Sequence, residues 1–139
     1  MKIGVPKEIK NHEYRIGLTP GSVREVVSRG HEVVVEANAA RVIGLEDKHY
    51  IQAGATIADT AAKVWSNADM IVKVKEPQAS EYPLICKDQI IFTYLHLAPD
   101  PKQTNALMDS GSVAIAYETV TDPESINALV CFGSGARWR

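Results

Sequence analysis

The alternation of short β-branched runs with stretches of helical character constrains the fold of this chain more than any other feature. Residues 2–5 (KIGV) predict a first strand. Thr19-Pro20 predict the start of a helix that runs to about Arg29, because proline suits the first helical position, where a backbone N–H has no intrahelical partner. Gly30 then ends the helix, and the valines of residues 31–36 (HEVVVE) favour a second strand. The same reasoning predicts strands over 70–74, 89–95 and 112–117, and helices over 46–53, 59–65 (with Asp59 as N-cap) and 101–110.

Strands that alternate with helices have the long return connections that parallel neighbours need. Such connections form right-handed crossovers and build an open sheet between two helical layers. The sequence therefore predicts a single α/β domain with a doubly wound, mainly parallel sheet, Rossmann-like or flavodoxin-like, covered on both faces. Ligands of such sheets bind beyond the carboxyl ends of the strands, so the polar residues that follow each strand are the candidates for function.

Length and composition fit one ordinary globular domain. The chain has 139 residues, of which 45% are hydrophobic and 23% charged. A net charge of −2 without a basic stripe argues against nucleic acid as a partner. No apolar run is long enough to cross a membrane, and the opening MKIGVPKE does not resemble a signal peptide, so we expect a cytoplasmic protein with no membrane partner. Cys86 and Cys131 are too few and too isolated for a disulfide framework or a zinc site, and no metal is expected.

Three candidate side chains follow predicted strands. Arg15 comes after the first strand, Lys75 follows residues 70–74, and His96 follows residues 89–95. A guanidinium can hold a carboxylate with two parallel hydrogen bonds, and an ammonium can donate to a keto oxygen. An imidazole can exchange a proton near neutral pH. If the three meet at one edge of the sheet, the pattern indicates a site for a small anionic carbonyl compound.

Each of these residues also has a plain structural interpretation. Arg15 lies near a turn, where a solvated surface role is more common. Lys75 lies between Lys73 and Glu76, as in an ordinary charged strand end. His96 lies between two leucines and could equally be a hydrogen-bonded core histidine. The residue pattern alone leaves both interpretations open.

Whole segments, however, resemble one enzyme family. The opening MKIGVPKEIKNHEYRIGLTPGSV, the central MIVKVKEPQ, and IFTYLHLAPD followed by AYETV are similar to the signatures of the alanine dehydrogenase family and of its relative, the nicotinamide nucleotide transhydrogenase N-terminal domain. The resemblance spans residues 1–122. Transhydrogenase domains resemble FIWPAQN where this chain has TYLHLAP, so His96 favours alanine dehydrogenase. Saccharopine dehydrogenases, with a related arginine, lysine and histidine, are a more distant alternative.

The resemblance implies a role for each candidate residue. It implies that Arg15 grips the substrate carboxylate, that Lys75 binds substrate and is a catalytic residue, and that His96 is the catalytic acid and base. The implied reaction is the reversible oxidative deamination of L-alanine to pyruvate and ammonia, with hydride passing to NAD. Glu8 and Tyr94 stand at family positions that line the pocket and orient Lys75 and the substrate.

Two segments depart from the family pattern. Residues 38–45 (NAARVIGL) stand where relatives have a glycine-rich turn. Residues 123–139 form an atypical tail, in which Gly133-Ser134-Gly135 lacks the third glycine, the following helix and the acidic residue of a dinucleotide fingerprint. We therefore expect a partial substrate-binding domain over 1–122 without an NAD-binding domain, which binds no cofactor and is inactive alone.

The alternative function is a non-catalytic module derived from that domain. Such a module binds a small molecule or a partner, or it self-associates. Apolar surface left exposed on a doubly wound layer favours a homo-oligomer, most simply a dimer.

Overall fold

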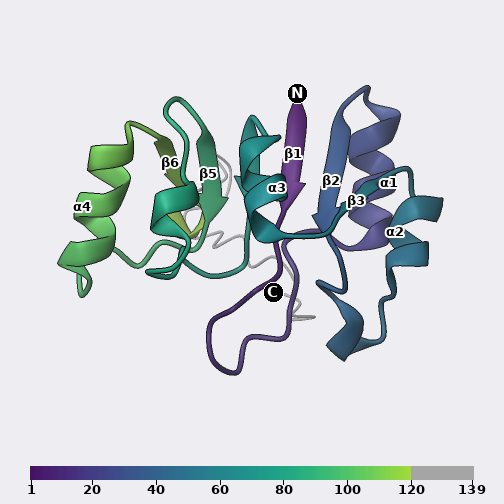
Figure 1. Cartoon of the computed structure of the whole chain (residues 1–139), viewed down its shortest axis with the longest axis horizontal. Coiled ribbons are helices and arrows are strands. Elements are labelled where there is room, and N and C mark those ends of the chain that lie inside the picture. Colours follow the sequence, from purple (N-terminus) through teal and green to yellow (C-terminus); the bar gives the residue numbers. More distant parts are fainter. Residues whose placement is uncertain (120–139) are drawn as a thin grey trace, which may run out of the picture.

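The computed structural model describes residues 1–119, which form one six-stranded sheet in which every strand runs parallel to its neighbours (Figure 1). The strands are β1 (Lys2–Val5), β2 (Glu32–Glu36), β3 (Thr56–Ala58), β4 (Met70–Val72), β5 (Ile90–Thr93) and β6 (Val113–Ala116). The α-helices are α1 (Pro20–Ser28), α2 (Asp47–Gln52), α3 (Ala61–Ser66) and α4 (Pro101–Ser110), and the 3₁₀ helices are η1 (Arg41–Ile43), η2 (Tyr82–Leu84) and η3 (Tyr117–Thr119). Within residues 1–119, none of these helices has the length and apolar character that a bilayer crossing requires.

The spatial order β3-β2-β1-β4-β5-β6 confirms the predicted doubly wound α/β fold. The chain starts in the middle of the sheet, builds outward through β2 to β3, and then crosses back to β4 before it builds outward to β6. The winding therefore reverses between β1 and β4, which is the position where ligands bind in sheets of this kind. The predicted tail, residues 123–139, lies outside the described residues.

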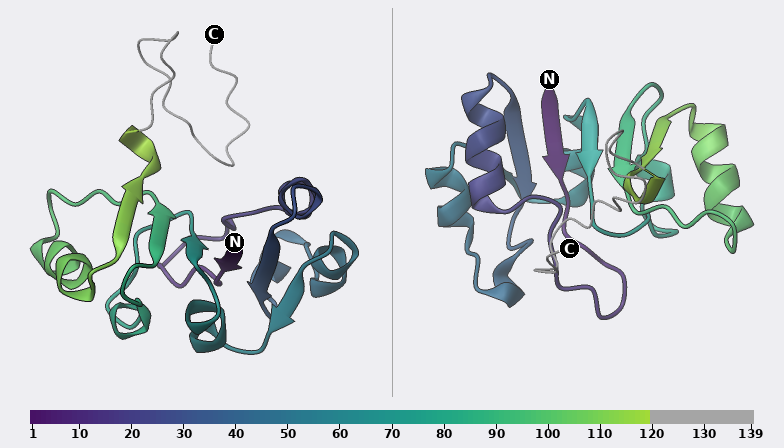
Figure 2. Two further views of the ribbon diagram at one scale, coloured as in Figure 1. Left: turned by 90° about the horizontal axis from the view of Figure 1, so that it is seen from above. Right: turned by 180° about the vertical axis from the view of Figure 1, so that it is seen from behind.

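Alternate side chains of the strands supply two apolar clusters, one on each face of the sheet. Successive side chains of a strand point to opposite faces, so β4 sends Val72 to one cluster and Ile71 to the other. Val23 of α1 and Tyr50 of α2 belong to the first cluster, and Trp65 of α3 belongs to the second. Figure 2 shows the corresponding layers, with α3 and α4 on one side of the sheet and α1 on the other.

The helical layer on the α1 side is incomplete in the part of the chain that the structure describes. A hollow of about 290 Å³ lies on this face, against strands β1, β4, β5 and β6. Its apolar lining side chains include Ile3, Leu18, Val26, Met70, Val72, Phe92 and Ile115. The expected cover of both faces by helices is therefore not complete here (Figure 2, left).

Local signals locate most helix ends correctly, with one error. α1 begins at Pro20 as predicted, and Thr19 caps it, because its hydroxyl accepts from the Ser22 backbone N–H at 3.3 Å. The predicted N-cap Asp59 is wrong: the α3 cap is Thr60, and Asp59 instead forms an ion pair with Lys63 at 2.7 Å. No sequence signal predicts β3, because three residues are too few to show a period.

Candidate functional site

The connections that follow β1 and β4 lie against each other where the winding of the sheet reverses. The connection after β1, residues 6–19, is named the β1 loop here and carries Arg15. Gly17 allows the loop to return across the end of β4, since a side-chain carbon at this position would overlap the carbonyl oxygen of Val72. An ion pair between Lys10 and Glu76 joins the loop to the segment that follows β4.

Three hydrogen bonds from neighbouring strands fix the backbone of the segment that follows β4. Glu8, after β1, accepts from the Val74 N–H at 2.7 Å. The Val74 carbonyl accepts from the phenol of Tyr117, which follows β6. The Lys75 carbonyl accepts from the hydroxyl of Thr93, the last residue of β5, at 2.8 Å. Because these bonds come from residues after β1, at the end of β5 and after β6, the position of Lys75 is set by most of the carboxyl edge of the sheet.

A buried ion cluster supports the same segment. The Lys73 ammonium lies 2.9 Å from Oε1 of Glu81 and 3.4 Å from Oε2 of Glu8. All three residues are buried, and the Lys73 side chain has no exposed surface. Burial raises the pKa of Glu8, and the positive charge of Lys73 only partly offsets this effect. Lys73, which flanks Lys75, is therefore a buried member of an ion cluster and not an exposed charge at the strand end.

The turn after β5 presents His96 to solvent. One carboxylate oxygen of Glu118 accepts from the backbone N–H of Leu95 at 3.0 Å and of His96 at 2.9 Å. The Leu95 carbonyl accepts from the Gln103 side chain of α4 at 2.9 Å. These bonds hold His96 in a left-handed conformation with φ of 47°, which is uncommon for a residue other than glycine. His96 is exposed, so its interpretation as a core histidine is wrong.

Arg15 is paired within the β1 loop. Its Nε and Nη2 donate to the two carboxylate oxygens of Glu13 at 2.8 and 2.6 Å. These hydrogen bonds lower the pKa of Glu13 to about 2, so Glu13 is ionised at neutral pH. The pairing uses one edge of the guanidinium, and the outer edge formed by Nη1 and Nη2 donates no hydrogen bond to residues 1–119. Arg15 therefore keeps a second edge for a ligand.

The structure brings the candidate side chains together. The Lys75 ammonium lies 4.9 Å from the centre of the Tyr94 ring. Tyr94 in turn stacks on His96, with ring centres 5.8 Å apart and an interplanar angle of 20°. On the other side, Arg15 and Lys75 both act on the carboxylate of Glu13 and lower its pKa. Arg15, Glu13, Lys75, Tyr94 and His96 all lie in the connections that follow β1, β4 and β5 at the carboxyl edge of the sheet, and these five residues are named the edge row below.

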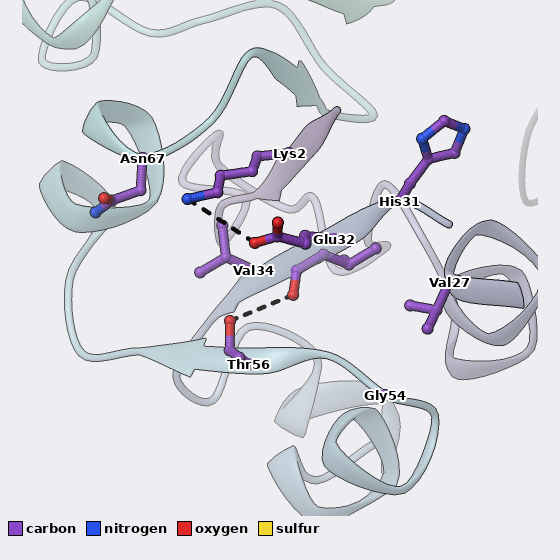
Figure 3. Close-up of a pocket in the computed structure, with 9 residues that line it drawn as sticks. Lys2, Val27, His31, Glu32, Val34, Gly54, Thr56 and Asn67 are labelled. Atoms are coloured by element: carbon purple, nitrogen blue, oxygen red, sulfur yellow. Dashed lines mark hydrogen bonds and ion pairs between the residues drawn. The ribbon is translucent and has the colours of Figure 1, made fainter. Parts of the chain in front are cut away.

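Two hollows at opposite ends of the strands differ in what lines them. One of about 270 Å³ is lined by the β1 loop and includes Glu8, Glu13 and Arg15. A larger one of about 390 Å³ lies at the amino ends of the strands, where Lys2 points toward Glu32 with 3.8 Å between ammonium and carboxylate (Figure 3). The larger hollow contains no candidate residue. Residues 1–119 also contain no cluster of three His, Cys, Asp or Glu side chains that could hold a metal ion.

Comparison with known proteins identifies the family. The family model described as alanine dehydrogenase/PNT, N-terminal domain, matches residues 4–138. The chain belongs to this family. An alanine dehydrogenase from Halomonas elongata is 53% identical over 124 residues, which cover 89% of this chain and 33% of the relative. A solved L-alanine dehydrogenase matches with a TM-score of 0.87 and 51% identity, over 93% of this chain and 35% of that one.

The alanine dehydrogenase/PNT N-terminal domain family also includes transhydrogenases. A solved transhydrogenase from Sinorhizobium meliloti matches with a TM-score of 0.79 and 29% identity, over 85% of this chain and 35% of that one. The resemblance predicted from the sequence is thereby confirmed. The chain spans about a third of the length of the relatives that it matches.

Sequence reasoning missed the residues that hold the edge row in place. Neither the burial of Lys73 nor the contacts of Tyr117 and Glu118 leave a periodic signal in the sequence, because their partners lie far along the chain. The similarity of the AYETV segment to the family is the one signal that covers Tyr117 and Glu118. Glu13 lies within the opening motif, but only the structure shows that it holds Arg15.

Proposed function

We propose that this domain binds pyruvate and L-alanine at the edge row, as the substrate-binding part of an alanine dehydrogenase. The observation that supports the proposal is the place of Arg15, Lys75 and His96 after β1, β4 and β5 at one edge of the sheet, with Lys75 over the Tyr94 ring and Tyr94 stacked on His96. Pyruvate carries one carboxylate and one carbonyl oxygen. The edge row offers one free guanidinium edge, one ammonium and one exposed imidazole, which match these groups.

Each side chain has a chemical role in this proposal. The outer edge of Arg15 holds the substrate carboxylate through two parallel hydrogen bonds. The Lys75 ammonium, held over the Tyr94 ring, donates to the keto oxygen and stabilises the negative charge that develops there. His96 gives a proton to that oxygen in the reductive direction and accepts one in the oxidative direction. Glu8 acts through the Val74 backbone and so fixes the position of Lys75.

The hydride acceptor implied by the family resemblance is NAD, which supplies the redox chemistry when it is bound. A dinucleotide site needs a tight glycine-rich turn directly after the first strand, leading into a helix. The β1 loop instead runs from residue 6 to 19 with charged side chains, and its Gly17 packs on Val72. Residues 1–119 therefore do not fit NAD, although their strand order is the one found in dinucleotide-binding domains.

Calorimetric titration with pyruvate tests the binding proposal. Wild-type protein should release or absorb heat with one pyruvate per chain, and Arg15→Ala should abolish the signal. Arg29→Ala is the matched control, because Arg29 pairs with Glu25 at 2.8 Å on the surface of α1. A folded wild-type chain that binds no pyruvate would contradict the proposal.

A second part of the proposal is that the 139-residue chain has no alanine dehydrogenase turnover alone. Hydride transfer requires the nicotinamide and the substrate carbon to be held together, and residues 1–119 fit only the substrate. Incubation with L-alanine and NAD at alkaline pH, followed by NADH absorbance, should show no rate above buffer. Robust turnover by the purified chain would refute this part.

A second candidate function is self-association, with a second copy of this chain as the partner. It is supported by the apolar hollow on the α1 side and by β6, which ends the sheet within residues 1–119 and exposes Val113 and Ile115. A two-fold contact over this surface would bury it twice. Sedimentation analysis tests this candidate. A monomer at high concentration excludes it, and a dimer that dissociates in Ile115→Lys supports it.

A further inference from the structure

We propose that Glu13 is a specificity-determining residue that restricts the edge row to keto acids with a single carboxylate. The inference rests on the proposed function, because it concerns the same site. It predicts that Glu13 excludes dicarboxylic keto acids, which differ from pyruvate-like acids by a second negative charge. Neither the family resemblance nor the sequence pattern assigns a role to this residue.

The charge balance of the edge row carries the argument. Glu13 hydrogen-bonds Arg15 through both carboxylate oxygens, and the charge of Lys75 acts on the same carboxylate. Glu13 is ionised at neutral pH, since its pKa is held at about 2. Two positive charges against one negative charge leave a single net positive charge, which is matched by one substrate carboxylate.

The geometry places Glu13 beside the position where a substrate carboxylate would bind. Glu13 occupies the edge of the Arg15 guanidinium formed by Nε and Nη2, which leaves the edge formed by Nη1 and Nη2 for the substrate. The Glu13 side chain is 8% exposed and both of its carboxylate oxygens accept from Arg15, so its charge is fixed in place beside the outer edge of the guanidinium. A second carboxylate in the site would either meet Glu13 or draw Lys75 away from the keto oxygen. Like charges that are brought together in this way lower affinity and so give specificity.

Within residues 1–119, the other cations near the β1 loop offer no substitute partner for a second carboxylate. Lys10 is already paired with Glu76, and Lys73 is buried in its own ion cluster. Lys7 lines the hollow beside Arg15, but it is exposed, and exposed charge pairs contribute little. Glu13 therefore decides how much negative charge the site accepts.

A matched pair of ligands tests the proposal by calorimetric titration. 2-Oxoglutarate and 2-oxopentanoate have the same chain length, and they differ in carrying a carboxylate or a methyl group at the far end. Wild-type protein should bind 2-oxopentanoate at least about tenfold more tightly than 2-oxoglutarate. Glu13→Gln should reduce this preference by about tenfold, whereas Glu13→Asp, which keeps the charge, should retain most of it.

The control is Glu25→Gln, which changes the net charge by the same amount on the surface of α1, where Glu25 pairs with Arg29. This variant should keep the wild-type preference. Two results would overturn the role of Glu13 and leave the proposed binding site unaffected. In the first, wild-type protein binds pyruvate but does not discriminate between the matched ligands. In the second, Glu13→Gln folds and discriminates between them as wild type does. If folded wild-type protein binds no pyruvate, the proposed function falls, and this inference falls with it.

Discussion

Lys75 and Arg15 supply the two positive charges of the edge row, but different parts of the molecule hold them. Lys75 follows β4 in a segment whose backbone is fixed by residues after β1, at the end of β5 and after β6. Arg15 lies in the β1 loop, and its guanidinium is held by Glu13, two residues away. One side of the site is therefore built by the whole fold, and the other is built by a local pair.

This difference separates stability from ligand binding. The bond between Glu8 and Val74 joins residues 66 positions apart, and the bond between Tyr117 and Val74 spans 43 positions. Bonds of this kind break only when the sheet opens, so their loss should lower the free energy of unfolding of the whole domain. The pair between Arg15 and Glu13 can be lost without opening the sheet, so its loss should mainly change binding.

The largest expected effect comes from Lys73→Met. Removal of the ammonium leaves the carboxylates of Glu8 and Glu81 buried without a counter-charge, which costs about 3–5 kcal/mol of the free energy of unfolding. Urea unfolding followed by circular dichroism measures this loss. The matched control is Lys63→Met on α3, where the pair with Asp59 is exposed and contributes little to stability. If both variants lose the same free energy of unfolding, the buried ion cluster stabilises the domain no more than a surface ion pair does.

Glu118→Ala should have the next largest effect. The variant loses the acceptor for the backbone N–H groups of Leu95 and His96, which costs about 1–3 kcal/mol of the free energy of unfolding. The left-handed turn at His96 should then relax. The imidazole resonances of His96, resolved by NMR from those of the other histidines, should shift more than those of His49 on α2. An unmoved His96 would show that the turn does not depend on Glu118.

Tyr117→Phe should cost less, about 0.5–1.5 kcal/mol of the free energy of unfolding. The phenol donates to the Val74 carbonyl and accepts from the Tyr94 N–H, so it bridges the segments after β4 and β5. The phenol is protonated at neutral pH and can donate, and burial raises the pKa of Tyr117 further, to about 12. Tyr14→Phe is the control, because Tyr14 is 54% exposed. Urea unfolding should show a larger loss of unfolding free energy for Tyr117→Phe than for Tyr14→Phe. Equal losses would show that the Tyr117 phenol does not stabilise the domain.

The same comparison explains how much the sequence could predict. Strand and helix alternation is a local pattern, so the fold class and the edge that carries Arg15, Lys75 and His96 follow from it together with the rule for ligand sites in such sheets. The burial of Lys73 and the raised pKa of Glu8 do not follow from it, since both depend on partners that only the folded chain brings within reach.

The pH dependence of stability separates the two regions through their glutamates, with the smallest effects of the series. Burial raises the pKa of Glu8 above its ordinary value of 4.5, so the folded chain holds this proton more tightly than the unfolded chain does. The contribution of Glu8 to stability therefore falls as pH rises from 4.5 through the folded-state pKa. Glu13 behaves in the opposite sense, because hydrogen bonds from Arg15 lower its pKa to about 2. Its contribution is fully present above pH 4.5 and is lost as pH falls toward 2.

Unfolding by urea at a series of pH values, in wild type, Glu8→Gln and Glu13→Gln, measures these opposite trends. The stability difference between wild type and Glu8→Gln should decrease with rising pH above 4.5. The difference between wild type and Glu13→Gln should increase with rising pH below 4.5 and stay level above it. Because Arg15 is 43% exposed, water and salt screen this pair and keep the second trend shallow. Trends of the same sign would mean that the buried carboxylate and the loop carboxylate occupy similar environments, and the contrast between the two sides of the site would then be lost.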